Sequence, residues 1–353
     1  MSMTSKYRHF IPCVLGVSFV LLQTASEAVA QVSESLVFEI PADARAAALG
    51  GRILADLHPD LHSASNNVAL LDSAMERRLA IDFVDYFAGI SLTTVNYAFK
   101  PRSKFNGQIG ARFQNFGKFQ EMDAAGNNLG TFKGSESLLF TGWSYKVDST
   151  WTFGVQGFIG MRSLDREVAG LFGTDLTFHG IWPQHNLAIG AGVTSLGYQF
   201  NIDGTQPNGR LPQDLQIGIT KGFLNAPFTF YLRAGHLETW DLAPSGTYDD
   251  IIDPITGAII QNSTFKWGDQ LLRHVGFGTS ISIGPALTLM TGFDYRRRKE
   301  MQAAGRLGTN GLALGLDFST QRFRIRMSRN TYHFAGSSTH FGIAFNPSVF
   351  MPQ

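Results

Sequence analysis

After Arg78 the sequence becomes a series of segments of about ten residues in which apolar and polar side chains alternate. In Gly311–Ser319, for example, the large apolar side chains fall on one face and the small or charged ones on the other. Successive side chains of a strand point to opposite faces, so each segment predicts a strand with one apolar face. Gly, Pro, Asn and Asp separate the segments. The chain is therefore all-β, either a soluble sandwich or a closed membrane barrel.

The segment RFRIRM at Arg322–Met327 presents that choice most sharply, because arginine and apolar side chains alternate along it. A sandwich would bury the apolar face, whereas a barrel would turn it to lipid and the arginines to a polar lumen. In a barrel, parity places a polar network in the lumen, formed by Arg112, Arg233, Asp294, Asp317, Arg322, Arg324 and Arg326. Such a network either plugs the lumen with ion pairs or lines a conduit for solute.

Composition and the start of the chain favour the membrane barrel. Residues 1–30 have the pattern of a secretory signal peptide, with Lys6 and Arg8 before an apolar run and cleavage expected between Ala30 and Gln31. Charged residues make up only 16% of the chain, against about 25% in ordinary soluble domains. No later stretch is long and apolar enough for a transmembrane helix, so strands would have to cross the bilayer.

Several functional classes are excluded. The single cysteine, Cys13, lies in the predicted signal peptide, so disulfides, thiolate metal sites and cysteine nucleophiles are not expected. The chain after residue 30 has no net charge, which argues against a nucleic-acid partner. Histidines such as His179 and His236 have acidic neighbours, but no spacing typical of a hydrolase or metal site occurs. A hydrolase is the weakest interpretation, and we expect no catalytic residue, metal or cofactor.

The alternating segments predict strands at 79–85, 90–99, 105–116, 137–147, 151–161, 187–200, 214–221, 228–236, 272–283, 287–296, 310–319, 322–332 and 338–345. Bacterial barrels have even strand numbers, with short turns at one end and long loops at the other. A further strand at Gly173–Ile181 restores this alternation and brings the total to about 14. The predicted long loops are Gly117–Glu136, Arg162–Asn186, Leu237–Leu271 and Arg297–Thr309. We expect them outside the cell, with both termini in the periplasm of an outer-membrane protein.

Residues 31–78 do not alternate and are predicted to form a separate N-terminal segment before the barrel at 79–345, which residues 346–353 follow as a tail. The segment contains ARAAALGG at Ala44–Gly51 and then NNVALL at Asn66–Leu71. These motifs resemble the start of the FadL-like outer-membrane barrels, and more closely the PorV and PorQ group of the type IX secretion machinery. Asp82–Phe99 and Gly197–Thr220 are similar to the PorQ proteins, so the resemblance covers the chain after residue 30.

The resemblance implies that the N-terminal segment forms a hatch inside the barrel. The residues of the hatch-like motif are Arg45, Gly50, Gly51, Asn66 and Asn67. FadL-like transporters have Asn-Pro-Ala where this chain has Asn67-Val68-Ala69. Without the proline, the local backbone need not be held as it is in the transporters. The alternative to a gating hatch is a periplasmic lead-in that packs in the barrel mouth.

For a PorQ-like barrel the resemblance implies a membrane anchor without chemistry of its own. Such a barrel holds a soluble PorZ-like protein at the cell surface, with the PorU sortase and PorV, in a complex that joins cargo to anionic lipopolysaccharide. The candidate docking residues lie in predicted loops and comprise Phe116, Phe119, Trp240, Tyr248, Ile251, Ile252, Arg296, Arg297 and Arg298. Loops that merely cover the barrel mouth are the alternative for these residues.

Two other functions remain open. One is FadL-like transport of hydrophobic small molecules, against which the predicted Arg-rich lumen counts. The other is a PorV-like cargo shuttle.

Overall fold

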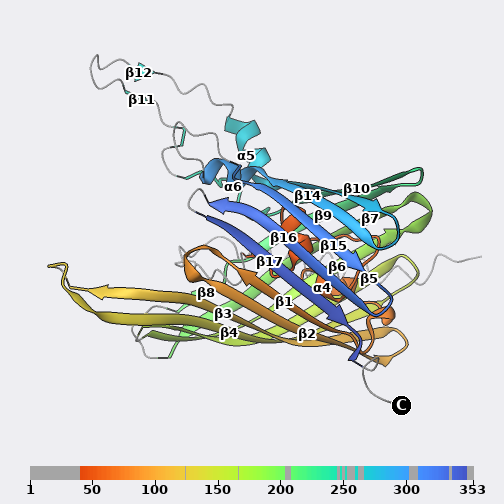
Figure 1. Cartoon of the computed structure of the whole chain (residues 1–353), viewed down its shortest axis with the longest axis horizontal. Helices are drawn as coiled ribbons and strands as arrows, with labels where there is room; N and C mark the ends of the chain where they lie inside the picture. Colours follow the sequence, from red (N-terminus) through yellow and green to blue (C-terminus); the bar gives the residue numbers. More distant parts are fainter. Residues whose placement is uncertain are drawn as a thin grey trace, which may run out of the picture. The chain divides into compact units, whose positions relative to one another are not determined.

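The structure is a computed structural model that describes residues 40–347 apart from 124, 166, 203–207, 245–246, 249–250, 253–258, 261–265, 302–308 and 334–335. In this part of the chain, fourteen long strands and the two-residue strand β8 form one antiparallel sheet (Figure 1). The sheet order is β6-β5-β4-β3-β2-β1-β17-β16-β15-β14-β13-β10-β9-β7, and pairing of β6 with β7 closes it into a barrel. The predicted fold of about 14 strands is confirmed.

The strands of the barrel follow the order of the sequence. They are β1 (Leu79–Asp85), β2 (Ser91–Arg102), β3 (Phe105–Met122), β4 (Asn128–Lys146), β5 (Trp151–Leu164), β6 (Glu167–Trp182), β7 (Leu187–Asn201), β8 (Gly209–Arg210), β9 (Asp214–Phe223), β10 (Ala226–Ala234), β13 (Val275–Ile283), β14 (Leu287–Asp294), β15 (Leu312–Ser319), β16 (Phe323–His333) and β17 (Gly336–Phe345). The short strands β11 (Ile251–Ile252) and β12 (Ile259–Ile260) pair only with each other. The further strand expected at Gly173–Ile181 is part of β6.

Helices before and between the strands are short. They are α3 (Ala44–Ala48), α4 (Leu61–Ala64), η1 (Val68–Leu70), η2 (Ser73–Met75), η3 (Phe87–Gly89), η4 (Pro183–His185), α5 (Lys266–His274) and α6 (Tyr295–Glu300). Among the described residues, no helix is long and apolar enough to cross a membrane.

The connections sort by length between the two ends of the barrel. At the end that we call the turn end, tight connections such as 102–105, 223–226 and 319–323 join neighbouring strands. Leu79 and Phe345, the first and last barrel residues, pair with each other at this same end. The opposite end, the loop end, carries the long connections from β10 to β13 and from β14 to β15. The long connections therefore all lie at one end, as the sequence predicts, although β5 and β6, like β16 and β17, are joined closely at that same end.

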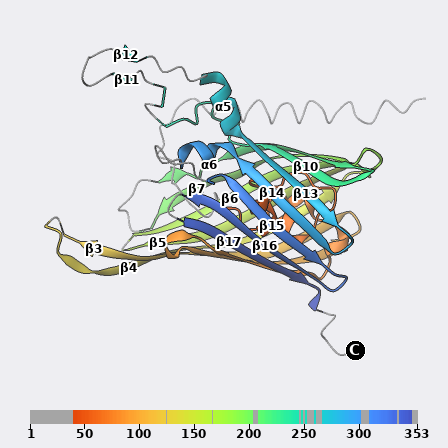
Figure 2. The ribbon, with the colours of Figure 1, turned by 45° about the horizontal axis from the view of Figure 1, so that its top comes forward.

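The predicted loop Gly117–Glu136 is wrong, because β3 and β4 continue through most of it as a two-stranded hairpin. The two strands pair with each other from Lys118 and Lys133 onward, where neither β2 nor β5 accompanies them. Figures 1 and 2 show this hairpin reaching beyond the rest of the barrel. Gly117, at φ 87°, lies at a register shift between Asn115 and Lys118. The glycine marks an irregularity within the ladder and not the end of the strand.

Three further loop predictions need correction. The predicted loop Arg162–Asn186 is mostly strand, because β5 ends at Leu164 and β6 begins at Glu167. The connection that contains Arg297 forms helix α6, whose first turn is capped where Asp294 accepts a hydrogen bond from the backbone N–H of Arg297 at 3.1 Å. In the β10–β13 connection, α5 replaces both the last residues of the predicted loop Leu237–Leu271 and the first residues of the predicted strand at 272–283.

The outward face of the wall is apolar. Large side chains such as those of Leu139, Ile159 and Leu314 are more than half exposed there. On β16, Met327 is likewise exposed while Arg326, its neighbour, is fully buried inside the barrel. Contiguous apolar surface of this extent is stable against lipid and not against water. The chain is therefore an integral membrane barrel with a lipid-facing outer wall.

Replacing Leu316 by Arg should destabilise the barrel by about 2–4 kcal/mol if that position lies near the bilayer midplane. Leu316 points outward between Leu289 and Met327 on the neighbouring strands. The control is Leu312→Arg, at the loop end of the same strand, where the cost falls to about 0–1 kcal/mol. Urea unfolding in phospholipid vesicles measures both variants. Equal costs at the two positions would contradict a lipid-embedded wall.

Candidate functional site

Residues 40–78, which we call the inner segment, lie inside the barrel (Figure 1). Helix α3 packs against β14 to β17, α4 against β1, β2 and β17, and η1 against β4 to β6. Side-chain caps define these short helices: Asp43 accepts hydrogen bonds from the first backbone N–H groups of α3, and Asp60 does so for α4. The inner segment thus touches the wall on several sides.

Glycines on the inward face of the wall allow this close approach. A Cβ at Gly190 would lie 1.9 Å from the carbonyl oxygen of Leu54, and one at Gly292 would lie 2.4 Å from the backbone nitrogen of Gly50. Similar contacts occur at Gly154, Gly278 and Gly315. A cavity of about 20 Å³ remains between residues 49–55 and β9, β10 and β13, space for about one water molecule. Backbone packing leaves little room between the inner segment and this side of the wall.

Arg326 joins the inner segment to the wall by ion pairs. Its side chain is fully buried, and its Nε lies 2.9 Å from Asp317 on β15. Its two Nη atoms bind Asp60, and Nη1 also lies 3.4 Å from Asp43. Arg324 adds a second bridge, 2.8 Å from Asp60 and 2.8 Å from Asp317. Burial alone would raise the pKa of Asp60, but the positive charges of Arg326 and Arg324 hold this pKa well below its usual value.

A second buried ion pair stiffens the inner segment itself. Arg45 on α3 binds Asp56 through both Nη atoms. Its Nη2 also donates a hydrogen bond to the hydroxyl of Tyr231 on β10 at 2.9 Å. The hydroxyl of Ser63 donates to Asp56 at 3.2 Å. The three buried acids of the inner segment, Asp43, Asp56 and Asp60, therefore each lie against an arginine, as buried charges require.

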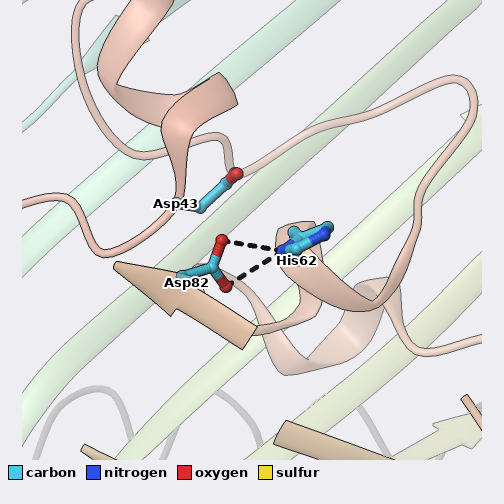
Figure 3. Close-up of side chains that lie close together, drawn as sticks. All are labelled: Asp43, His62 and Asp82. Carbon is cyan, nitrogen blue, oxygen red and sulfur yellow. Dashed lines mark hydrogen bonds and ion pairs between the residues drawn. The ribbon is translucent and has the colours of Figure 1, made fainter. Parts of the chain in front are cut away.

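Asp43, His62 and Asp82 form a further buried cluster (Figure 3). The Nδ1 of His62 lies 2.8 and 2.9 Å from the two carboxylate oxygens of Asp82. These residue types can bind a metal ion, but Nδ1 is already held by Asp82 and the cationic Arg326 adjoins Asp43. These contacts therefore favour a buried cluster of ion pairs over a metal site. At the loop end, Asp214, His236 and Glu238 form a more exposed group of potential ligand atoms.

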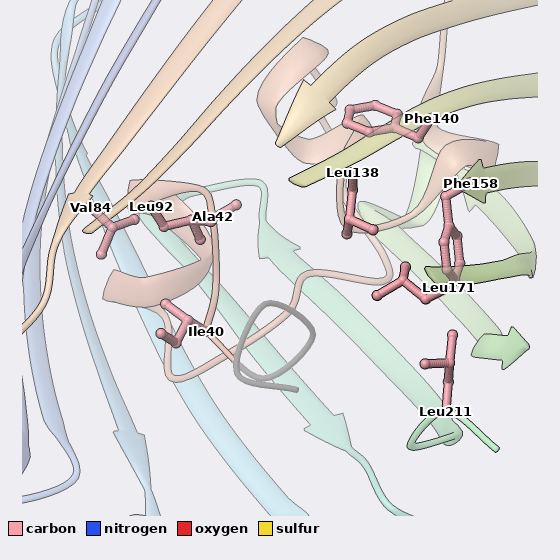
Figure 4. Packing of buried hydrophobic residues seen from close by; sticks show 9 residues of the cluster. All are labelled: Ile40, Ala42, Val84, Leu92, Leu138, Phe140, Phe158, Leu171 and Leu211. Carbon is pink, nitrogen blue, oxygen red and sulfur yellow. The ribbon is translucent and has the colours of Figure 1, made fainter. Parts of the chain in front are cut away.

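Toward the loop end, a group of apolar side chains lines part of the lumen (Figure 4). The ion pair of Glu136 and Arg162 lies on the same inward face. This apolar lumen cluster comprises Ile40, Ala42, Val84, Leu92, Leu138, Phe140, Phe158, Leu171 and Leu211. Phe140 and Phe158 are directly paired on β4 and β5. Their rings lie over Gly110 and Gly173, where an added Cβ would come within 2.3 and 2.5 Å of them.

A hollow of about 540 Å³ lies over the same strands. It is lined by Ile109, Gly110, Leu139, Phe140, Thr141, Gly157, Phe158, Ile159, Phe172 and Gly173. Ile109, Leu139 and Ile159 belong to the exposed outer face of the wall, so the hollow opens there. A Cβ at Gly157 would meet nothing within 4 Å. Phe140 and Phe158 line the hollow and also belong to the apolar lumen cluster, so the two adjoin across the wall.

Only part of the predicted polar network meets in the lumen. Asp317, Arg324 and Arg326 lie together there, and Arg233 binds Asp294 at 3.1 Å. Arg112 points inward from β3, apart from them, whereas Arg322 does not line the lumen and lies exposed in the turn between β15 and β16. The sequence interpretation missed the apolar lumen cluster because Leu138, Phe140 and Leu171 share the inward faces of their strands with polar side chains. The run LLF at 138–140 is the signal that could have revealed it.

The glycines and asparagines of the hatch-like motif set the backbone conformation of the inner segment or hold it by hydrogen bonds. Gly50 and Gly51 have positive φ angles of 82° and 135°, which favour glycine. Asn66 donates a hydrogen bond to Asp43 at 3.4 Å. The side chain of Asn67 caps η1 and donates to the carbonyl oxygens of Leu54 and Phe178. The expected cleavage site at Ala30 and Gln31 lies outside the described residues.

The structure does not bring the predicted docking residues together in one loop. Phe116 and Phe119 lie on β3, whereas Trp240 and Tyr248 lie in the connection from β10 to β13. Ile251 and Ile252 form β11, and Arg296, Arg297 and Arg298 belong to α6. The hydroxyl of Tyr248 donates to Asp269 at 2.8 Å.

Comparison with known proteins relates the fold to hydrocarbon transporters. Neither the family models nor the curated proteins match this sequence. The toluene transporter TodX of Pseudomonas putida is 12% identical over 86% of this chain and 96% of its own, with a TM-score of 0.50. The toluene transporter TbuX of Ralstonia pickettii (14% identity, 87% and 97% coverage, TM-score 0.48) and a Pseudomonas aeruginosa FadL homologue (11%, 86% and 98%, 0.45) are also similar. The similarity to TodX shows that the chain shares the barrel fold of that protein.

Replacing Arg326 by Met should destabilise the protein by about 3–5 kcal/mol, because three buried carboxylates lose their shared cation. The matched control is Arg322→Met in the exposed turn, which should stay within about 0.5 kcal/mol of the unaltered protein. Denaturant unfolding measures the difference, and limited proteolysis of residues 40–78 reports release of the inner segment. Equal stability of the two variants would show that Arg326 does not hold this segment.

Proposed function

We propose that the barrel takes up small apolar molecules, which bind in the lumen at the apolar lumen cluster. The observation that carries this proposal is the cluster itself, which places buried Phe140 and Phe158 side by side on the inward face of the wall. Binding pockets for small apolar molecules are lined by such side chains. The fold shared with TodX, a toluene transporter, supports the same class of ligand.

The inner segment favours a sideways route out of the lumen. Backbone contacts and ion pairs hold that segment across the path toward the turn end. By contrast, the wall beside Phe140 and Phe158 is a single backbone layer with an apolar hollow at its outer face. Movement of the two rings away from Gly110 and Gly173, with local opening of the wall, would connect the lumen to lipid. An apolar molecule on this route would avoid the buried charges around Arg326.

Replacing Phe158 by Gln should lower the initial rate of toluene uptake several-fold, because a buried amide without partners costs about 1–3 kcal/mol. Uptake of radiolabelled toluene is measured in cells whose outer membrane contains the barrel. The control is Met161→Gln, on the outward face of the same strand. An unchanged rate for Phe158→Gln, or an equal loss for Met161→Gln, would argue against binding at the apolar lumen cluster.

A second candidate function is docking of a soluble protein, and the β3–β4 hairpin favours it. Phe119, Met122 and Leu129 are exposed on the part of the hairpin that extends past the neighbouring strands. The rings of Phe119 and Phe132 stack with their centroids 5.1 Å apart. Exposed apolar side chains on an ordered ribbon are suited to a protein interface.

This second proposal takes its candidate partners from the sequence resemblance. They are a PorZ-like surface protein, acting with PorU and PorV, or secreted cargo in a PorV-like role. It also requires the loop end to face the outside of the cell and both termini to face the periplasm.

Shortening the hairpin tests the docking proposal. Residues 119–132 are replaced by an Asn-Gly turn between Lys118 and Lys133, which pair in the hairpin. We expect loss of a PorZ-like protein that co-purifies with the unaltered barrel after mild detergent extraction from the native membrane. The barrel itself should stay folded, because the deleted residues pair only with each other. Co-purification at the unaltered level would remove the hairpin from the docking site.

A further inference from the structure

Helix α5, at the loop end, is amphipathic, but it is the apolar face that is exposed and the polar face that is buried. Four of its polar side chains are buried, namely those of Asp269, Gln270, Arg273 and His274, whereas Lys266 at its start is exposed. Its apolar side chains are exposed, at 60% for Trp267, 39% for Leu271 and 46% for Leu272. A helix on the surface of a water-soluble domain has the opposite arrangement, with its apolar stripe turned to the core.

Hydrogen bonds fix this orientation of α5. Asp269 accepts hydrogen bonds from the hydroxyls of Tyr248 at 2.8 Å and Tyr295 at 2.7 Å, and from Nε of Arg273 at 2.8 Å. The side chain of Gln270 accepts a hydrogen bond from the backbone N–H of Leu242 at 3.0 Å. Burial alone would raise the pKa of Asp269, but the hydrogen bonds that Tyr295, Arg273 and Tyr248 donate to its carboxylate hold this pKa at about 2. The apolar face therefore cannot turn inward without breaking this network.

The helix stands above short strands of the barrel wall. Strands β14 and β15 have 8 residues each and β10 and β13 have 9, against 18 in β3 and 19 in β4. A tilted strand needs about 9–11 residues to cross the hydrocarbon core. Helix α5 leads directly into β13, and its last residue, His274, accepts a hydrogen bond from the backbone N–H of Gly235 at 3.0 Å. Figure 2 shows α5 at the upper end of β13.

The exposed face of α5 continues the apolar surface of the wall below it. Leu232 and Phe277 are paired and exposed on β10 and β13, near the point where α5 ends. Above them, the rings of Trp240 and Trp267 have centroids 6.4 Å apart, and Trp240 is also exposed. Tryptophan is enriched where membrane proteins meet the boundary between headgroups and acyl chains.

We propose that α5 lies in the lipid surface at the loop end, with Trp267, Leu271 and Leu272 in contact with the headgroup and acyl-chain boundary. Lipid is the occupant that fits, because this face is continuous with the lipid-facing wall and compensates for short strands on that side. The helix would extend the lipid-facing apolar surface above β13 to β15. This inference does not depend on whether the lumen binds apolar molecules.

Depth-dependent quenching tests the proposal on the full barrel. The chain after residue 30 has no cysteine, so Trp267→Cys and Leu271→Cys provide single sites for an environment-sensitive fluorophore. The labelled proteins are reconstituted in phosphatidylcholine vesicles with or without a lipid that carries a doxyl quencher near the headgroup. Phe277→Cys on the wall is the lipid-facing control, and Ala125→Cys at the exposed tip of the β3–β4 hairpin is the water-facing control.

We expect both α5 sites to lose fluorescence in doxyl vesicles to an extent comparable with Phe277→Cys, while Ala125→Cys keeps its signal. Fluorescence at both α5 sites that stays at the level of Ala125→Cys would overturn the proposal. Disulfide-linked dimers of Leu271→Cys without quenching would also overturn it, by placing a second copy of the chain on this face. Quenching at Leu271→Cys alone suffices if Trp267→Cys does not fold.

Discussion

The fully buried guanidinium of Arg326 is the interaction on which the interior of this barrel depends. It binds one carboxylate of the wall, that of Asp317, and two of the inner segment, those of Asp43 and Asp60. A buried charge of either sign is costly without its partner. The barrel and the inner segment are therefore each incomplete alone, and the inward glycines allow their backbones to meet closely around this pairing.

The lumen consequently has a mixed lining. The side of β14 to β17 holds the charges that retain the inner segment, whereas β4 to β6 present Leu138, Phe140 and Phe158 beside the ion pair of Glu136 and Arg162. In the function proposed above, an apolar molecule at Phe140 would not have to pass Arg326.

Local patterns predicted what depends on local geometry. Alternation placed Met327 outside and Arg326 inside, and loop lengths indicated the strand within β6, because side-chain parity and turn spacing follow directly from strand geometry. The partners of Arg326 could not be predicted, since Asp60 is 266 residues away in the sequence. The sequence analysis predicts the start of a loop at Gly117, but β3 and β4 pair with each other again beyond this residue. Helix α5 was missed because its apolar residues form the exposed face, opposite to the usual pattern.

The most direct test of a lumen closed by the inner segment is ionic conductance of the purified barrel in a planar lipid bilayer. The packing around Gly190 and Gly292 and the ion pairs of Arg326 predict that the unaltered protein carries no steady ionic current, and that Arg326→Met produces openings as the inner segment loosens. A stable open-channel current through the unaltered protein would contradict the account, because it would require a continuous water-filled path past the inner segment.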